Sequence, residues 1–214
     1  MNIKSFGCSF IFGSELADDK HNTSPSQLTW PALYAKELGH DYQCYARPGA
    51  GNLQIAECTL TQLAGNEPAL YIIGWTWIDR FDYTNPDSDQ WQTIMPIDNN
   101  AVAKLYYRDL HSQYRDKLTT LMSIKLVIDT LQQKRYPFIM TYMDDLIFET
   151  EWHTTPAILE LQKYIHPYMT TFEGLNFLDW SKNHGYPVTK NWHPLEAAHR
   201  AAAEYISQLG VYKI

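Results

Sequence analysis

Short apolar runs alternate along the chain with longer stretches in which apolar residues recur every three or four positions. Runs of the first kind indicate strands, and we expect them at 3–6, 42–45, 69–74, 138–143 and 176–179. Stretches of the second kind predict helices, at about 30–38, 53–63, 103–134, 157–164 and 194–209. The run 69–74 is apolar throughout, which is typical of a strand covered by helices on both faces of a parallel sheet.

This alternation predicts an α/β protein, built as a three-layer α/β/α sandwich around a mostly parallel sheet. We interpret residues 1–214 as one domain with an insertion at about 78–102, where the helical period breaks at asparagine, aspartate and proline residues. Ligands bind such sheets beyond the carboxyl ends of the strands. Four segments fall there: 7–9, 49–52, 74–77 and 144–145.

Composition narrows the function. A net charge of −7 with only 17 Lys and Arg argues against nucleic acid as a partner. The three cysteines have no metal-ligand spacing and cannot all pair, so we expect neither a disulfide scaffold nor a metal site. We see no signal-peptide pattern and no run of 18 apolar residues, so we expect a cytoplasmic protein with no membrane contact. The oligomeric state is left open.

Two distant segments carry the candidate chemistry. Ser9 follows the first predicted strand between Gly7 and Gly13, and His193 with Pro194 begins the last predicted helix. A serine hydroxyl becomes a useful nucleophile when a neighbouring imidazole takes its proton. The pair therefore predicts a serine-histidine hydrolase that needs no cofactor.

These segments resemble the blocks of the SGNH, or GDSL-type, hydrolase family. The family's Gly-Asp-Ser is matched by Gly7-Cys8-Ser9, with Cys8 in place of the aspartate, and its Asp-x-x-His-Pro is matched by residues 190–194, with Lys190 in place of the acid. The resemblance implies a flavodoxin-like, five-stranded sheet, Ser9 as nucleophile and His193 as base. It also implies an esterase, lipase, thioesterase or carbohydrate deacetylase.

The family's oxyanion-hole blocks are matched less closely. The resemblance assigns the backbone of Ser9 and of Gly49 as donors. Thr76 stands where the family has an asparagine, and a hydroxyl offers one shorter, rotating donor in place of an amide. Asn52, in the neighbouring loop, is a second candidate for the missing amide.

Lys190 leaves the partner of His193 open. The imidazole needs an acceptor on its second nitrogen to hold its tautomer and charge. Asp179 is our first candidate, Asp144 and Asp145 are others, and backbone carbonyls near Lys190 could serve in a dyad. The spacing along the chain does not choose between them.

The substrate is expected to be a small acyl ester, and an O-acetylated carbohydrate is preferred because aromatic residues crowd the insertion. Trp75, Trp77 and Arg80 are the candidate substrate-binding residues, against the alternative that they only pin the insertion to the sheet. Because Cys8, Thr76 and Lys190 all depart from family blocks, the rival reading is a domain without catalysis that binds glycans or joins an assembly. A nucleotide-binding protein is weaker still, since no phosphate loop is present.

Overall fold

The computed structural model describes residues 2–210, in which four parallel strands form the central sheet. These are β1 (Asn2–Phe6), β2 (Asp41–Cys44), β3 (Ala69–Trp75) and β6 (Phe138–Tyr142), in the order β2-β1-β3-β6. The α/β sandwich with a parallel sheet is thus confirmed, but a fifth strand is not. Its place beside β6 is reduced to one parallel bridge between Met140 and Met169.

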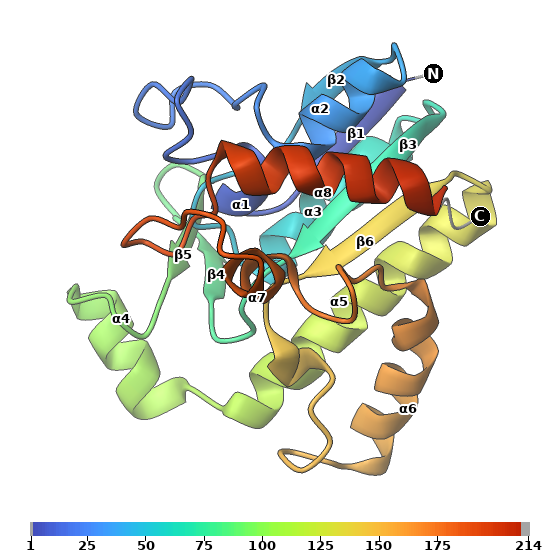
Figure 1. Cartoon of the computed structure of the whole chain (residues 1–214). Coiled ribbons are helices and arrows are strands. Elements are labelled where there is room, and N and C mark those ends of the chain that lie inside the picture. The colour runs from blue at the N-terminus through green and yellow to red at the C-terminus, as the bar shows by residue number, and fades with distance from the viewer. Residues whose placement is uncertain (1, 211–214) are drawn as a thin grey trace.

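Helices cover both faces of this sheet (Figure 1). One face packs against α2 (Trp30–Glu37), α7 (Phe177–Asn183) and α8 (Glu196–Leu209), and the other against α3 (Asn52–Ala64), α5 (Gln113–Lys134) and α6 (Pro156–Ile165). All seven residues of β3 are buried, as expected for an inner strand with helices on each side. None of the helices within 2–210 combines the length and apolar character needed to cross a bilayer.

The segment between β3 and α5 has more structure than its sequence suggests. It forms an antiparallel hairpin of β4 (Phe81–Thr84) and β5 (Trp91–Ile94), then α4 (Ala101–Leu105) and a π-helical turn, η1 (Tyr106–Leu110). Figure 1 shows these elements beyond the arrowheads of β3 and β6, where the strands end. This segment therefore lies at the carboxyl ends of the sheet, where sites are built in such folds.

Two boundary predictions were wrong. The helix predicted at about 103–134 is interrupted at residues 111–112. Ser112 caps the start of α5 by accepting the Arg115 N–H. The run 176–179 is not a strand: it begins helix α7, with the Asn176 side chain accepting the Asp179 N–H as the N-cap. Four residues are too few to separate a buried strand from a buried helical turn by pattern alone.

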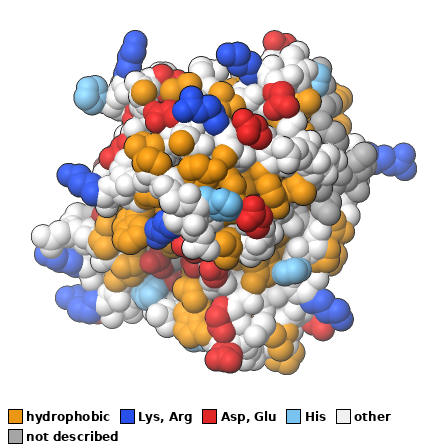
Figure 2. Space-filling model, viewed as in Figure 1, with side chains coloured by type: hydrophobic (Ala, Val, Ile, Leu, Met, Phe, Trp, Pro, Cys, Tyr) orange, Lys and Arg blue, Asp and Glu red, His pale blue; other side chains and the backbone are white. Residues whose placement is uncertain are grey.

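The remaining elements connect these layers. They are α1 (Ser9–Phe12), which follows β1 directly, and two short 3₁₀ turns, η2 (Asp145–Ile147) after β6 and η3 (His166–Tyr168) after α6. Figure 2 shows the same face of the molecule with hydrophobic side chains gathered in its middle, acidic and histidine side chains among them, and most Lys and Arg side chains near the outline. The basic side chains of this face are thus dispersed.

Candidate active site

The Ser9 side chain is held at the end of β1 by a tight turn. Cys8 is the N-cap of α1, and Ser9 is the first residue of that helix. A Cβ added at Gly7 would lie 2.6 Å from the Ile11 side chain and 3.0 Å from the Gly74 carbonyl oxygen. Only glycine therefore lets α1 pack this closely against β3, which fixes where the Ser9 hydroxyl is presented.

His193 lies on a closed loop before α8. The Thr189 N–H donates to the His193 carbonyl oxygen over 2.9 Å, and the His193 N–H donates to the Thr189 hydroxyl over 3.2 Å. A bridge between Val188 and Pro194 closes the base of the loop. These contacts thus fix the backbone of His193, from which the imidazole projects.

Ser9, His193 and Glu15 form one chain of hydrogen bonds. The Ser9 hydroxyl lies 2.9 Å from His193 Nε2, and His193 Nδ1 lies 2.5 Å from a Glu15 carboxylate oxygen. A carboxylate can only accept, so Nδ1 carries the ring proton and Nε2 is left as the acceptor for the serine hydroxyl. This tautomer is the one that a general base beside a nucleophile requires.

The Glu15 carboxylate is held by the loop that carries His193. Besides the imidazole, it accepts the Thr189 hydroxyl over 2.7 Å and the Asn191 side-chain amide over 2.8 Å. Burial acts to raise the pKa of Glu15, but the hydrogen bonds from Thr189, His193 and Asn191 outweigh it and bring the pKa below its ordinary value. Glu15 is therefore an ionised acceptor for the ring N–H of His193.

This geometry corrects the prediction that Asp179 is the acid beside His193. Asp179 lies in the first turn of α7, where its carboxylate accepts the Asn176 amide over 2.7 Å instead of contacting His193. Asp144 accepts the N–H groups of Ile78 and Leu146, and Asp145 accepts the Asn176 amide at 3.3 Å. Each of these carboxylates is bonded to another part of the chain, and within residues 2–210 none makes a hydrogen bond to His193.

Glu15 is the residue that sequence reasoning missed. The one signal was its position six residues after Ser9, in a chain whose histidine block carries Lys190 where the family has its acid. The Glu15 backbone is left-handed, with φ 68°, and Lys190 is exposed. A left-handed glutamate outside regular structure has no periodicity to reveal its direction, so only the folded chain could place it.

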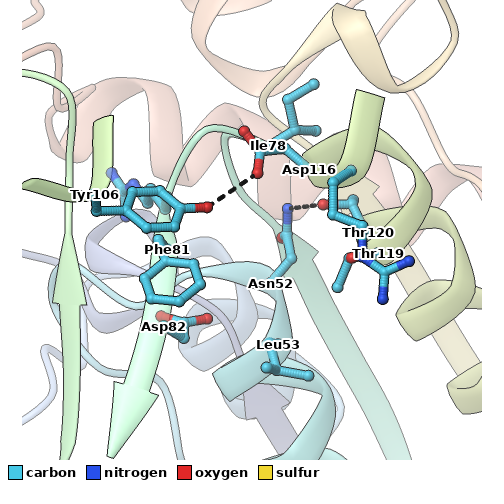
Figure 3. Close-up of a pocket in the computed structure, with 11 residues that line it drawn as sticks. Asn52, Leu53, Ile78, Phe81, Asp82, Tyr106, Asp116, Thr119 and Thr120 are labelled. Atoms are coloured by element: carbon cyan, nitrogen blue, oxygen red, sulfur yellow. Dashed lines mark hydrogen bonds between the residues drawn. The ribbon is translucent and has the colours of Figure 1, made fainter. Parts of the chain in front are cut away.

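Asn52 is not free to act as an oxyanion donor. Its amide donates to the Thr76 carbonyl oxygen over 3.0 Å and to the Thr120 hydroxyl over 3.3 Å, and its own oxygen accepts the Thr76 N–H over 2.8 Å. Figure 3 shows Asn52 reaching across to Thr120. Asn52 thus ties α3 to the end of β3. The buried Thr76 hydroxyl makes no hydrogen bond to the described residues.

The loop after β2 offers two glycines, and they differ in their surroundings. The Gly51 N–H donates to the Asp82 carboxylate over 2.9 Å, and a Cβ there would lie 2.5 Å from an Asp82 oxygen. Gly49 has φ 79°, and a Cβ there would meet nothing within 4 Å. Gly51 is committed to the packing of the hairpin, whereas Gly49 borders open space.

The three candidate substrate-binding residues differ in how deeply the structure buries them. Trp75 is completely buried in the core, so the expectation that it contacts substrate is corrected: its side chain points into the helix layer and not toward the site. Trp77 is half-buried and its ring lies 5.6 Å from that of Phe10, which is itself 5.2 Å from the His193 ring. Arg80 lies 4.9 Å over the Trp77 ring and donates to the Ala50 carbonyl oxygen over 2.9 Å. Trp77 and Arg80 thus remain beside the Ser9–His193 pair.

Residues 2–210 contain no group of three or more His, Cys, Asp or Glu side chains arranged to hold a metal ion. Cys8, beside Ser9, is buried in the core. The polar chemistry at the carboxyl end of β1 therefore rests on the hydroxyl, the imidazole and the carboxylate.

No protein-family model and no curated protein sequence matches the chain. Solved structures do match over nearly its whole length. A lipolytic protein of the G-D-S-L family from Veillonella parvula DSM 2008 has a TM-score of 0.54 at 13% identity, covering 98% of this chain and 97% of that one. The psychrotrophic esterase EstA from Pseudoalteromonas sp. has a TM-score of 0.55 at 9% identity, with coverage of 97% and 94%. The acetyl xylan esterase AlAXEase has a TM-score of 0.51 at 10% identity, with coverage of 99% and 100%. The chain therefore has the fold of the SGNH, or GDSL-type, hydrolases.

Proposed function

We propose that the protein is a serine ester hydrolase in which Ser9 is the nucleophile, His193 the general base and Glu15 the acid that orients the imidazole. The observation that carries the proposal is the continuous chain of hydrogen bonds from the Ser9 hydroxyl to the Glu15 carboxylate. Esterases among the structures of this fold agree with it. The three residue types in this order provide nucleophile, base and orienting group.

The reaction proceeds in two halves. The Ser9 oxygen attacks the ester carbonyl while His193 Nε2 takes the hydroxyl proton, and the resulting imidazolium is stabilised by the Glu15 carboxylate. The tetrahedral intermediate collapses as Nε2–H protonates the leaving alcohol, which leaves an acyl group on Ser9. Water then gives its proton to Nε2 and attacks the acyl group, and Ser9 recovers its proton as the carboxylic acid leaves.

The oxyanion is stabilised by the backbone N–H groups of Ser9 and Gly49. The Thr76 hydroxyl, which the sequence offered as a further donor, is left out because it is completely buried. Gly49 is favoured over Gly51 because the Gly51 N–H already donates to Asp82. Asn52 is left out, since its amide is engaged with Thr76 and Thr120. One preorganised donor of this kind contributes about 10²-fold or more to kcat.

The substrate is a small acyl ester. An O-acetylated carbohydrate suits the aromatic surroundings, because Trp77 and Phe10 lie beside His193 and aromatic faces suit sugar rings. Acetyl xylan esterases are among the proteins that share the fold. Arg80, held over Trp77, borders the same region.

A fluorophosphonate probe tests the proposal directly. We expect an adduct on Ser9, located by mass spectrometry, in the native protein and its loss in His193→Ala, because phosphonylation needs the base-activated hydroxyl. His184→Ala, which removes an exposed histidine bonded to Glu173 away from this site, is the matched control and keeps the adduct. A native protein that stays unlabelled would reject the hydrolase and favour the rival reading, a domain that binds glycans or joins an assembly.

A further inference from the structure

A cavity lies beside Trp77, whose ring is linked through that of Phe10 to the His193 ring. It has a volume of about 400 Å³ and is walled by aromatic and apolar side chains from three separate segments. Trp77 follows β3, Pro96 and Tyr107 belong to the segment between β3 and α5, and Trp152 belongs to the loop after β6. Three aromatic rings around one space form a surface suited to a sugar face or to a cation.

Carboxylates give this cavity its charge. Asp79, Asp116 and Asp144 line it, and neither Lys nor Arg is among its lining residues. Asp144 accepts two backbone N–H groups and Asp116 lies 2.7 Å from His111 Nε2, but the half-buried Asp79 carboxylate makes no hydrogen bond to another described residue. Of the three carboxylates, that of Asp79 is thus the one available for a ligand.

Burial is the largest influence on all three carboxyls and raises the pKa of Asp79, Asp116 and Asp144 above the ordinary value. Such a shift means that the charged form lacks sufficient stabilisation from its surroundings. A cation placed among these groups would supply that stabilisation and lower each pKa again.

The cations nearest the cavity are already engaged. Arg80 lies over the ring of Trp77 and donates to the Ala50 carbonyl oxygen. Lys117 donates to the carbonyl oxygens of Glu149 and Trp152, 5.3 Å from the centre of the Trp152 ring. Asp116 also faces a smaller neighbouring pocket, where Figure 3 shows it bonded to Tyr106. Neither Arg80 nor Lys117 is a lining residue of the cavity.

The cavity lies at the same edge of the sheet as the nucleophile. Ser9 follows β1, Trp77 and Asp79 follow β3, and Asp144 follows β6, and these three strands are adjacent in the sheet. The carboxyl ends of adjacent parallel strands meet at one edge, so Ser9 and these lining residues share that edge. The rings of Phe10 and Trp77 lead from the His193 ring to the cavity, at centroid distances of 5.2 Å and 5.6 Å.

We propose that this cavity binds an ammonium group on the alcohol part of the ester, so that the substrate is an ester of a cationic alcohol such as an amino alcohol, a quaternary ammonium alcohol or an amino sugar. The inference rests on the proposed function and narrows its substrate class. Aromatic rings and carboxylates without a lining cation select an ammonium group over a neutral group of the same shape. A neutral sugar alone would not need three carboxylates.

Binding is tested first without catalysis. Choline and 3,3-dimethyl-1-butanol have the same shape and differ by the positive charge, and each is titrated into Ser9→Ala by calorimetry. We expect choline to bind at least about tenfold more tightly, in line with a cation–π site reinforced by carboxylates. Asp79→Asn should remove most of that preference, while Asp87→Asn, an exposed aspartate in the β4–β5 turn, should retain it. Equal affinity for both alcohols would overturn the proposal.

Kinetics then link the cavity to the reaction. The native protein should hydrolyse acetylcholine with a kcat/KM at least about tenfold above that of 3,3-dimethylbutyl acetate, and the ratio should fall toward one in Asp79→Asn. Equal values, or hydrolysis of p-nitrophenyl acetate with neither matched ester accepted, would overturn the inference and leave the esterase intact. Failure to hydrolyse any ester while choline still binds Ser9→Ala would instead reject the proposed function.

Discussion

At the residue scale, the position of the acid is the most specific feature of this site. Glu15 lies in the turn after α1, six residues after Ser9, while the histidine loop has Lys190 where the family resemblance leads one to expect an acid. The histidine loop still contributes, because Thr189 and Asn191 hold the carboxylate in place. An acid supplied from the serine side keeps the same three-part arrangement with a different chain path, as expected when geometry and not sequence position defines the site.

Replacing Glu15 by glutamine tests this assignment. Glu15→Gln keeps the shape but removes the charge that stabilises the imidazolium, and an amide nitrogen can oppose the ring N–H. We expect kcat for p-nitrophenyl acetate to fall by about 10³-fold to 10⁴-fold with little change in KM. Asp179→Asn is the matched control and should leave kcat unchanged, since Asp179 bonds within its own helical turn. The reverse pattern would restore Asp179 as the acid.

At the element scale, the start of α3 is where the hairpin joins the sheet. Helix α3 has glycine at its N-cap, so its free N–H groups need another acceptor. Asp82 on β4 provides it, accepting the N–H groups of Gly51 and Gln54 over 2.9 Å each, and Thr93 on β5 donates to the same carboxylate. A buried carboxylate from the insertion therefore caps a helix of the main domain and holds the loop that contains Gly49.

This cap predicts a large difference between two glycine substitutions. In Gly51→Ala the new Cβ would meet the Asp82 carboxylate at 2.5 Å, so the carboxylate must move and uncap the helix. We expect the free energy of unfolding, measured by urea denaturation, to fall by about 2 kcal/mol or more. Gly65→Ala, where the nearest atom is 3.4 Å away, should change it by less than about 0.5 kcal/mol. Similar losses in both variants would contradict the role of Asp82.

At the scale of the whole molecule, the helix layer behind the active site is joined by one buried histidine. His199 on α8 accepts the Trp30 N–H at the start of α2 over 3.0 Å, and its ring lies 4.9 Å from that of Phe177 on α7. Burial lowers the pKa of His199 to about 3 from an ordinary value of 6.5. The folded protein therefore keeps this imidazole neutral under conditions in which the unfolded chain would protonate it.

This histidine makes stability depend on pH. Its contribution is complete above about pH 6.5 and is lost as the pH falls toward 3, because only the unfolded chain binds the proton in that interval. We expect its share of the free energy of unfolding to decrease by about 1.4 kcal/mol per pH unit near pH 5. In His199→Gln the slope of urea-measured stability against pH should be smaller by that amount. Should the variant not fold, NMR of the native protein must show one histidine ring, that of His199, which stays neutral at pH 5. A native protein in which every histidine ring is protonated at pH 5 would contradict the prediction.

The fold was largely predictable from the pattern of apolar residues. The four sheet strands were expected within one or two residues, because a buried strand such as β3 is apolar throughout and lies between helical stretches. The run 176–179 was not, since its helical state depends on the Asn176 cap and on burial of Phe177 and Trp180 against the sheet. Short segments take the conformation that their tertiary contacts select.

The candidate site was predictable only in part. Ser9, Gly49 and His193 could be proposed because each lies in a short segment that follows a predicted strand or precedes the last predicted helix, and the carboxyl ends of neighbouring strands meet at one edge. Trp75 could not be separated from Trp77, because the sequence does not say where the strand ends: Trp75 is the last residue of β3, whereas Trp77 lies beyond it. The structure buries the first and leaves the second at the cavity.

The sequence by itself determined the layered architecture, since periodicity and turn residues act over short stretches of chain, and the resemblance of two short motifs to a family's blocks indicated the pairing of a serine with a distant histidine. Tertiary structure alone decided which carboxylate orients that histidine, which aromatic rings face solvent and which acids gather around the cavity lined by Trp77 and Trp152. Each of those depends on side chains from remote segments meeting in space, as Glu15 meets Asn191 across 176 positions. Such meetings leave no period in the sequence to read.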